Sequence, residues 1–215
     1  KPELRPLATE ADVLVSPVDG TISQVAAIRE GRIIQAKNFD YSVLELLGGD
    51  AQRAQPFLNG QFTTIYLSPR DYHRIHMPLS GKLLEQVYVP GRLFSVAGHT
   101  ARTIPRLFAR NERVAAIFET EFGKMALVLV GAINVAAIET VWAGLITPPH
   151  KQDIRVDHYP EVALAKGAEM GRFNMGSTVI VLLENSAWDW GKASADQAVR
   201  MGAKLAEFTE KTYLV

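Results

Sequence analysis

Short apolar and β-branched runs, each ended by a turn-forming residue, are the feature of this sequence that most restricts its fold. Runs of this kind between Gly, Pro, Asn and Asp residues are typical of β-strands. The clearest runs cover residues 12–15, 61–67, 83–89, 113–119, 124–130 and 178–183. Helical patterns are confined to residues 41–47 and 96–107. We therefore expect a β-rich α+β fold of antiparallel sheets with tight turns and a few short helices.

Two sequence patterns occur twice and indicate a duplicated unit. P-V-D-G-T-I at 17–22 and P-L-S-G-K-L at 78–83 share the form P-x-x-G-x-apolar, and G-A-E-M-G at 167–171 resembles G-A-K-L-A at 202–206. Biotinyl and lipoyl carrier domains use similar turns, which favours a flattened β-barrel with carrier-domain-like duplicated units. P-x-x-G is also simply a favourable turn, so both interpretations stay open here.

The composition excludes several classes of protein and site. The 23 basic and 23 acidic residues among 215 cancel, unlike the charge of a strongly basic nucleic-acid binder. Cysteine is absent, which excludes disulfides, cysteine nucleophiles and thiolate metal sites. No apolar segment reaches the roughly 20 residues that a membrane-spanning helix needs, and the best candidate, 125–138, is shorter.

The ends of the chain and its polar segments give three further expectations. The sequence begins with Lys1 rather than Met, so we expect the natural N-terminus, with any signal or anchor, to precede it. The polar stretch 150–160 is expected to be an exposed linker. The stretch 184–198 is expected to be a loop between two strands.

Asp19, His73, His76 and Ser177 are the side chains best placed for chemistry, because each lies at the edge of an apolar run, where turns present functional groups. Ser, His and Asp are also the parts of a nucleophile, base and orienting residue. Each has an ordinary alternative: Asp before Gly and Ser after Gly are common in turns, and the two histidines could bind a metal. The residues alone predict a β-rich enzyme, with hydrolysis as one option.

Several longer segments resemble the bacterial phosphatidylserine decarboxylases. They are SPVDG (16–20), YLSPRDYHRIHMP (66–78), YVPGRLFSV (88–96), LFARNERV (107–114), ETVWAG and ITPP (139–149), and KGAEMGRFNMGST (166–178). The family's self-cleavage motif is usually LGST, and Met175 here replaces the Leu with a residue of similar size and apolarity.

The resemblance implies a pyruvoyl-dependent enzyme that makes its own cofactor. Ser177 attacks the Gly176 carbonyl, the chain is cut between these residues, and Ser177 becomes the pyruvoyl group. The resemblance assigns His76 as the base of this step and Asp19 as the residue that orients it. The mature enzyme then converts phosphatidylserine to phosphatidylethanolamine and CO2. His73 is expected to take part in this step, as a proton donor or as a contact to the substrate carboxylate, with Tyr66 as a weaker candidate for substrate binding.

The resemblance also implies an organisation and a set of partners. One catalytic domain, 1–215, would yield a β chain, 1–176, and an α chain, 177–215. The expected partners are phosphatidylserine, the membrane surface and a second copy in a homodimer, with no nucleic acid and no metal. The implied location is the cytoplasmic face of the bacterial inner membrane, as a peripheral protein, and the family's N-terminal membrane-docking region is expected to lie outside this sequence.

Two rival functions use the same residues or the same turns. A serine hydrolase with Ser177, His76 and Asp19 would leave the chain intact, although no G-x-S-x-G motif is present. A carrier-type binding module would need a modifiable Lys at a hairpin tip, and no such signal stands out. Leu93, Phe94 and Phe108 are candidates for an apolar site mouth, with ordinary core positions as the alternative.

Overall fold

The computed structural model describes residues 2–133, 137–148, 153–174 and 177–209. Within them, every paired strand runs antiparallel to its neighbour, and the helices are short. The expectation of a β-rich α+β fold of antiparallel sheets with a few short helices is confirmed.

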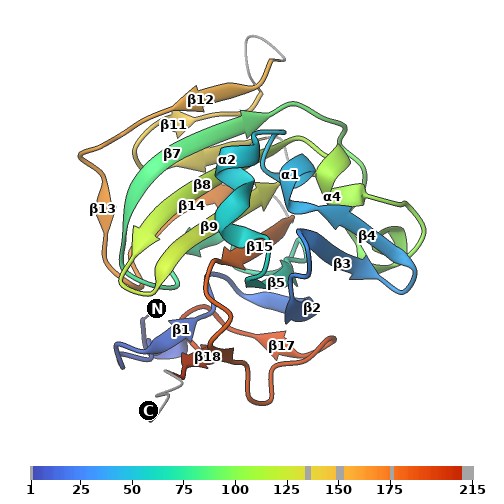
Figure 1. Cartoon of the computed structure of the whole chain (residues 1–215). Coiled ribbons are helices and arrows are strands. Elements are labelled where there is room, and N and C mark those ends of the chain that lie inside the picture. Colours follow the sequence, from blue (N-terminus) through green and yellow to red (C-terminus); the bar gives the residue numbers. More distant parts are fainter. Residues whose placement is uncertain (1, 134–136, 149–152, 175–176, 210–215) are drawn as a thin grey trace, which may run out of the picture.

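The largest sheet in the described residues has nine strands and forms the centre of the molecule (Figure 1). Its order is β12 (Arg155–Asp157), β7 (Gly81–Val89), β8 (Arg113–Thr120), β9 (Gly123–Val130), β15 (Thr178–Leu183), β5 (Gln61–Tyr66), β2 (Gly20–Ala27) and β17 (Ala198–Val199), with β13 (Ala163–Leu164) beside β7. The strands predicted from the apolar runs are therefore confirmed, with bounds that differ by a few residues.

Smaller sheets flank this one. One has the order β11 (Gly144–Leu145), β10 (Ile138–Thr140), β14 (Glu169–Phe173) and β6 (Arg74–His76). Another has the order β1 (Val13–Val15), β18 (Lys204–Phe208) and β16 (Trp188–Asp189), and β3 (Arg32–Ala36) pairs with β4 (Phe39–Ser42). Figure 1 shows β1 and β18, which lie near the two ends of the described chain, side by side.

The helices are α1 (Val43–Leu46), α2 (Ala51–Ala54), α3 (Gly98–Ala101) and α4 (Leu107–Arg110), with 3-10 turns η1 (Pro2–Leu4) and η2 (Gln55–Phe57). The predicted helix at 41–47 is confirmed as α1. Ser42 caps its N-terminus: the Ser42 hydroxyl accepts a hydrogen bond from the Glu45 N–H, and the Glu45 side chain accepts one from the Ser42 N–H.

The prediction of one helix at 96–107 is wrong, because the helical conformation is interrupted between α3 and α4. Pro105 has no N–H to donate and disfavours helical geometry in the residue before it. Arg106 then takes a positive φ of 54°. The segment therefore forms two short helices with a turn between them.

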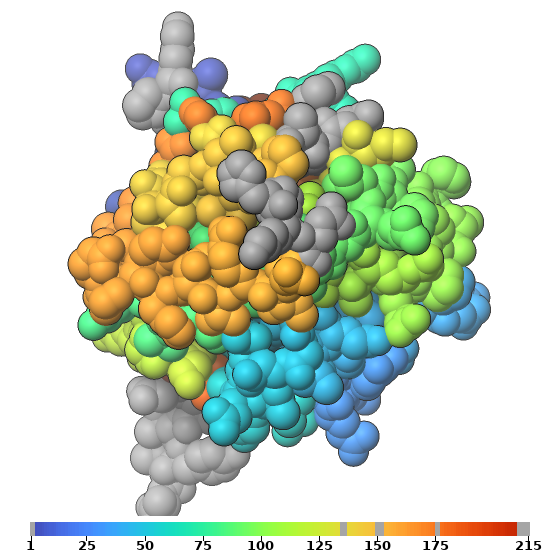
Figure 2. All heavy atoms as spheres, turned by 90° about the horizontal axis from the view of Figure 1, so that it is seen from above, coloured from blue at the N-terminus to red at the C-terminus, as the bar shows by residue number. Residues whose placement is uncertain are grey.

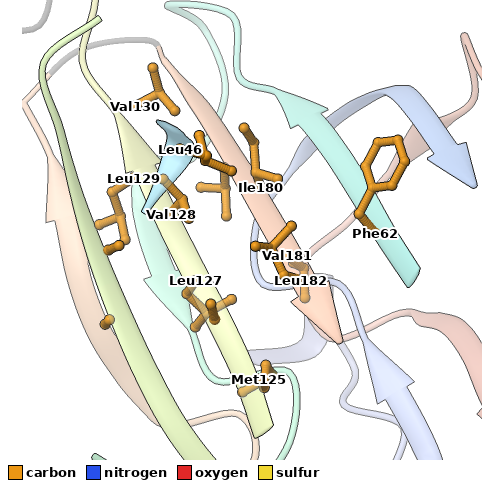
Figure 3. Close-up of a cluster of buried hydrophobic side chains, with 14 of the residues drawn as sticks. Leu46, Phe62, Met125, Leu127, Val128, Leu129, Val130, Ile180, Val181 and Leu182 are labelled. Atoms are coloured by element: carbon orange, nitrogen blue, oxygen red, sulfur yellow. The ribbon is translucent and has the colours of Figure 1, made fainter. Parts of the chain in front are cut away.

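The core lies around β9 and β15, and Figure 3 shows part of it. All six residues of β15 are buried, as expected for a continuous apolar run that is covered on both faces. Val128 on β9 pairs with Ile180 on β15, and Figure 3 shows these side chains close together. This packing holds β15 in the middle of the large sheet.

The two P-x-x-G segments occupy equivalent places in the fold. One joins β1 to β2, which begins at Gly20, and the other joins β6 to β7, which begins at Gly81. β1 pairs with β18 and β6 pairs with β14. Each of these partner strands starts two residues after a glycine with positive φ, Gly202 at 87° and Gly167 at 80°.

The two units also exchange backbone hydrogen bonds. The Val15 N–H donates to the Pro78 carbonyl at 3.2 Å, and the His76 N–H donates to the Pro17 carbonyl at 2.9 Å. The repeated sequence pattern therefore corresponds to a repeated strand–turn–strand unit. The flattened barrel is wrong, because in the described part of the chain the sheets stay open, with β12 and β17 at the ends of the largest one.

The polar stretches are more structured than expected. The expected linker at 150–160 includes β12, an exposed edge strand on β7, since backbone pairing does not require apolar side chains. The expected loop at 184–198 includes β16, where Trp188 is buried against Phe122 and Phe208. Figure 2 shows the orange segment with β12 and β13 on one side of the molecule and the blue-to-cyan segment with α1 and α2 on another.

Candidate active site

Ser177 lies immediately before β15 and is fully buried. Its backbone forms a two-way pair with Leu67: the Ser177 N–H donates at 3.0 Å and the Ser177 carbonyl accepts at 2.7 Å. Its hydroxyl donates to the Val130 carbonyl, at the end of β9, at 2.7 Å. Strands on both sides therefore hold the serine in one position. Gly176 and Met175 lie outside the described residues.

Tyr66 and Asp19 lie at the same end of the large sheet as Ser177. Tyr66 is the last residue of β5 and pairs with Thr178 on β15 and with Thr21 on β2. Asp19 comes two residues before Thr21. The sheet register therefore brings together three segments that are far apart in the sequence.

The Asp19 carboxylate is held by Arg5 and by the backbone of Met201. Arg5 donates from Nε at 3.0 Å and from Nη2 at 2.7 Å, and the Met201 N–H donates at 2.9 Å. Burial raises the pKa of Asp19, but these hydrogen bonds and the charge of Arg5 outweigh burial and hold the pKa below its ordinary value. Asp19 is therefore a stable carboxylate at neutral pH.

Both ring nitrogens of His76 have partners. Nδ1 lies 2.8 Å from the Gly167 carbonyl, which can only accept, so we assign the proton to Nδ1. Nε2 then accepts from the Tyr72 hydroxyl at 3.2 Å, and the Tyr72 and His76 rings stack with centroids 5.8 Å apart. In this structure His76 is thus oriented by Tyr72 and Gly167, while Asp19 contacts Arg5 and Met201.

His73 lies beside the chain that leads to Ser177. Its backbone carbonyl accepts from the Phe173 N–H at 3.0 Å, and Phe173 ends β14. Its Nδ1 contacts the Asp71 carbonyl. Its Nε2 is buried and has no hydrogen-bond partner among the described residues, and the same holds for the Thr178 hydroxyl next to Ser177.

A cleft of about 460 Å³ opens at this end of the sheet, with Arg5, Asp19, Thr21, Tyr66 and Arg200 among its lining residues. Tyr66 and Ser68, the two neighbours of Leu67, also line this cleft, and Leu67 is the backbone partner of Ser177. Among the described residues, no three His, Asp or Glu side chains are arranged to hold a metal ion.

Known proteins match this chain over nearly its whole length. The profile of the phosphatidylserine decarboxylase family covers residues 1–207. The chain belongs to the phosphatidylserine decarboxylase family. This family is one of enzymes, so the enzyme prediction is confirmed along with the family resemblance.

Individual relatives match this chain over nearly all of its length. A phosphatidylserine decarboxylase proenzyme from Bordetella pertussis is 59% identical over 212 residues, which cover 96% of this chain and 71% of the relative. Proenzymes from Pseudomonas fluorescens Pf-5 and Pseudomonas aeruginosa LESB58 are each 58% identical, over 94% of this chain and 72% of the relative. The word proenzyme in these names indicates that these relatives of the decarboxylase family are made as precursors.

Sequence reasoning missed Arg5 and Tyr72. Tyr72 lies inside the segment that carries the resemblance, so its position there was an available signal. No sequence signal pointed to Arg5, because it lies outside the segments that carry the resemblance and is one of several charged residues near the start of the chain. Of the apolar candidates for a site mouth, Leu93 is 42% exposed, whereas Phe108 is buried at 2% and packs against Tyr41 as an ordinary core residue of this decarboxylase-family fold.

Proposed function

We propose that this chain cuts itself between Gly176 and Ser177, converts Ser177 to a pyruvoyl group, and uses that group to decarboxylate phosphatidylserine to phosphatidylethanolamine and CO2. Membership of the family supports the decarboxylation, and the precursor names of the relatives support a cut chain. The observation that carries the proposal is a fully buried Ser177 whose backbone bonds to that of Leu67 and whose hydroxyl donates to the Val130 carbonyl.

Self-cleavage needs no group from outside the chain except water. The Ser177 Oγ attacks the Gly176 carbonyl carbon, and its proton passes to a base, for which His76 is the candidate. The peptide C–N bond breaks, the amine takes a proton, and an ester remains. Loss of the Cα proton and the ester oxygen leaves a free Gly176 carboxylate and a dehydroalanine at 177. Water then releases ammonia and leaves the ketone of the pyruvoyl group.

The surroundings of Ser177 suit a group with two adjacent carbonyls. The Thr178 hydroxyl, next to position 177, is a buried polar atom with no hydrogen-bond partner among the described residues, and it can donate to such a group. The buried His73 Nε2 likewise has no partner there, and because Nδ1 faces the Asp71 carbonyl, Nε2 of the neutral ring can accept a hydrogen bond. The pyruvoyl group supplies an electron sink for the charge left by CO2. His73 would contact the substrate or donate a proton there, and Tyr66 would line the approach from the cleft.

Denaturing mass spectrometry tests the proposal directly. The expected result is two fragments divided at Gly176/Ser177, with the smaller one blocked at its N-terminus and two hydrogens heavier after borohydride reduction. Ser177→Ala should remain a single chain. A single intact wild-type chain that reacts with a serine-directed phosphonate would overturn the proposal and favour the serine hydrolase.

We further propose that the enzyme works at a membrane surface, on the cytoplasmic face of the bacterial inner membrane. No helix in the described part of the chain is long and apolar enough to span a bilayer. Two exposed apolar side chains support the proposal: Leu93, which packs near Gly131, and Ile133, which is 68% exposed. Leu93 lies beside Gly131, the residue after Val130, and Ile133 follows Val130 by three positions. Val130 accepts the hydrogen bond of the Ser177 hydroxyl.

Vesicle flotation checks this membrane contact. Wild-type protein should float with phosphatidylserine vesicles, and Leu93→Asp with Ile133→Asp should reduce the bound fraction several-fold. Leu84→Asp, at an exposed site on β7, is the matched control. Equal flotation of all variants would contradict the assignment of this surface.

We also propose that the protein forms a homodimer. Light scattering checks this, and the mass of a monomer would contradict it.

A further inference from the structure

We propose that Arg92 and Arg110, together with Leu93 and Phe94, form a surface that binds the phosphate groups of anionic lipids. These four residues are called the Arg92–Arg110 surface. The inference rests on the proposed contact with a membrane and adds which lipids that contact selects. Apolar side chains alone do not distinguish one headgroup from another, whereas positive charge favours an anionic bilayer.

The charges of the chain are unevenly distributed around this surface. The whole chain has 23 basic and 23 acidic residues, yet residues 86–111 contain four arginines and neither Asp nor Glu. Arg106 pairs with Glu45. Arg92 and Arg110 are exposed, and neither forms an ion pair within the part of the chain that the structure describes. Two positive charges are therefore presented to the solvent.

Glu112, the next acidic residue along the chain, does not neutralise these charges. It is buried, at 9% exposed, and its carboxylate accepts the hydrogen bond of the Tyr88 hydroxyl at 2.7 Å. It forms no ion pair with either arginine among the described residues. The positive charge of the surface is thus left for a partner outside the chain.

Backbone and aromatic contacts hold the two arginines on one surface. The Arg92 N–H donates to the Arg110 carbonyl at 2.8 Å. The Arg110 guanidinium lies 4.9 Å from the centroid of the Phe94 ring, within the range of a cation–π contact. Leu93, between Arg92 and Phe94 in the chain, is exposed. Planar guanidinium groups beside apolar side chains suit the boundary between the phosphates and the acyl chains of a bilayer.

Asn111 fixes this surface to the strand that holds Ser177. The side chain of Asn111 is fully buried; it accepts from the Phe94 N–H at 3.2 Å and donates to the Phe94 carbonyl at 2.8 Å. It also donates to the Gly131 carbonyl at 2.8 Å. Gly131 follows Val130, whose carbonyl accepts the Ser177 hydroxyl. An anionic lipid bound by the two arginines therefore lies at the end of the large sheet that holds Ser177.

The proposed reaction would itself weaken this contact. Phosphatidylserine carries one net negative charge and phosphatidylethanolamine carries none, because CO2 leaves with the charge of the carboxylate neutralised by one added proton. Each turnover therefore lowers the surface charge that attracts the two arginines. The Arg92–Arg110 surface thus favours membrane that is rich in substrate over membrane that is rich in product.

Flotation with vesicles that contain no substrate tests the inference apart from catalysis. Wild-type protein should bind phosphatidylcholine vesicles that contain phosphatidylglycerol more tightly than phosphatidylcholine alone, and added salt should weaken only the excess. Arg92→Gln with Arg110→Gln should lower the affinity for the anionic vesicles by about 10- to 30-fold, since each arginine near such a surface contributes about 5-fold. Binding to phosphatidylcholine alone should stay near wild type.

Arg29→Gln with Lys82→Gln is the matched control, because it removes two charges at the other end of the large sheet. Both side chains are exposed. Arg29 follows β2 beyond the end at which Ala27 pairs with Gln61, and Lys82 pairs with Glu119, at the opposite end of β7 from Val89. The control should bind anionic vesicles as wild type does, and thermal midpoints check that all variants fold.

Three results would overturn the inference: equal wild-type affinity for the two kinds of vesicle, unchanged binding in the arginine variant, or an equal loss in the control. Each would leave the proposed membrane contact standing. A wild-type protein that binds neither vesicle would overturn both. Binding to a DNA duplex as tight as binding to the anionic vesicles would show attraction to any polyanion, and the assignment to lipid would fail.

Phosphatidylserine vesicles test the dependence on charge during the reaction. With phosphatidylserine as the only anionic lipid, the bound fraction of wild type should fall as phosphatidylethanolamine accumulates, whereas Ser177→Ala should stay bound. A constant bound fraction during conversion would contradict binding through the two arginines. If no phosphatidylethanolamine forms, the proposed function fails instead, and the vesicles without substrate still decide the inference.

Discussion

At the scale of single residues, Asp19 makes two separate contacts: one closes a turn, and the other is an ion pair with Arg5. Ser80, its equivalent in the second turn, makes only the first kind of contact. The two residues hold equivalent places in the repeated P-x-x-G turns. The Asp19 carboxylate accepts from the Met201 N–H at 2.9 Å, and the Ser80 hydroxyl accepts from the Lys166 N–H at 3.0 Å. This bond closes the turn before a glycine in each unit. The pair with Arg5 belongs to Asp19 alone.

Asp19→Ser should keep the hydrogen bond that closes the turn and lose the ion pair with Arg5. Because a serine already makes this bond at position 80, we expect the free energy of unfolding to fall by no more than ~1 kcal/mol. Self-cleavage should slow by about 100-fold or more, because the carboxylate that holds Arg5 at this end of the large sheet is lost. Urea unfolding of the Ser177→Ala forms and gel analysis of the active forms measure the two effects.

Ser80→Ala is the matched control for that variant. It should destabilise the fold by about 1 kcal/mol and leave the rate of self-cleavage unchanged. If Ser80→Ala slowed cleavage as much as Asp19→Ser, the turn itself would explain the effect and the separate role of Asp19 would be disproved.

The pKa of Asp19 predicts a dependence on acid. Burial alone would raise this pKa, but the bonds from Arg5 and Met201 place it below the ordinary value of 3.8. A carboxyl group with a lowered pKa stabilises the fold above its ordinary pKa, and this contribution is lost as the pH falls through the lowered value. The difference in unfolding free energy between wild type and Asp19→Ser should therefore shrink below about pH 3.8. A constant difference would contradict the ion pair.

At the scale of elements, one buried arginine joins a helix to the large sheet. Arg113 on β8 is 2% exposed and donates to the carbonyls of Glu45, Leu46 and Asn111. Burial lowers its pKa to about 10. Two of these carbonyls belong to α1, which has only four residues and cannot be stable alone. Arg113 is thus the polar attachment of α1 to β8.

Arg113→Ala should leave these buried carbonyls without a donor and open a cavity. We expect a loss of about 3 kcal/mol or more in the free energy of unfolding, measured in urea. Arg32→Ala, which removes an exposed ion pair with Asp40, should cost less than ~1 kcal/mol. Equal effects for the two variants would show that the buried contacts of Arg113 are not the cause.

At the scale of the whole molecule, the proposed cut leaves the two chains interlocked. The α chain would begin next to β15, which lies between β9 and β5 of the β chain. It would also contribute β18, which pairs with β1 near the other end of the sequence. The cut removes one covalent bond and leaves this packing in place.

The fragments should therefore stay together in native conditions. Size-exclusion chromatography of the cut protein should give one peak that contains both chains, and urea above the unfolding midpoint should separate them. Release of the small fragment without denaturant would contradict the central placement of β15.

The strands, the repeated turns and the family could be predicted from the sequence alone. Residues 61–67, 124–130 and 178–183 form strands where their apolar runs predicted them, because short runs of apolar and β-branched residues between turn residues are a local property of the sequence. The family motifs also named Asp19, His73, His76 and Ser177 as candidates, and their catalytic roles stay predictions.

Which of these residues contact one another, and where the sheets end, could not be predicted without the folded structure. Arg5 reaches Asp19, and Ser177 donates to Val130, across separations at which the sequence holds no local signal. Backbone hydrogen bonding between distant segments also decides that the large sheet stays open and that residues 155–157 form an edge strand. The interruption of the helix at Pro105 likewise depends on which backbone groups form hydrogen bonds. Such contacts form between segments that folding brings together, so their partners are set by the register of the sheets rather than by any one segment.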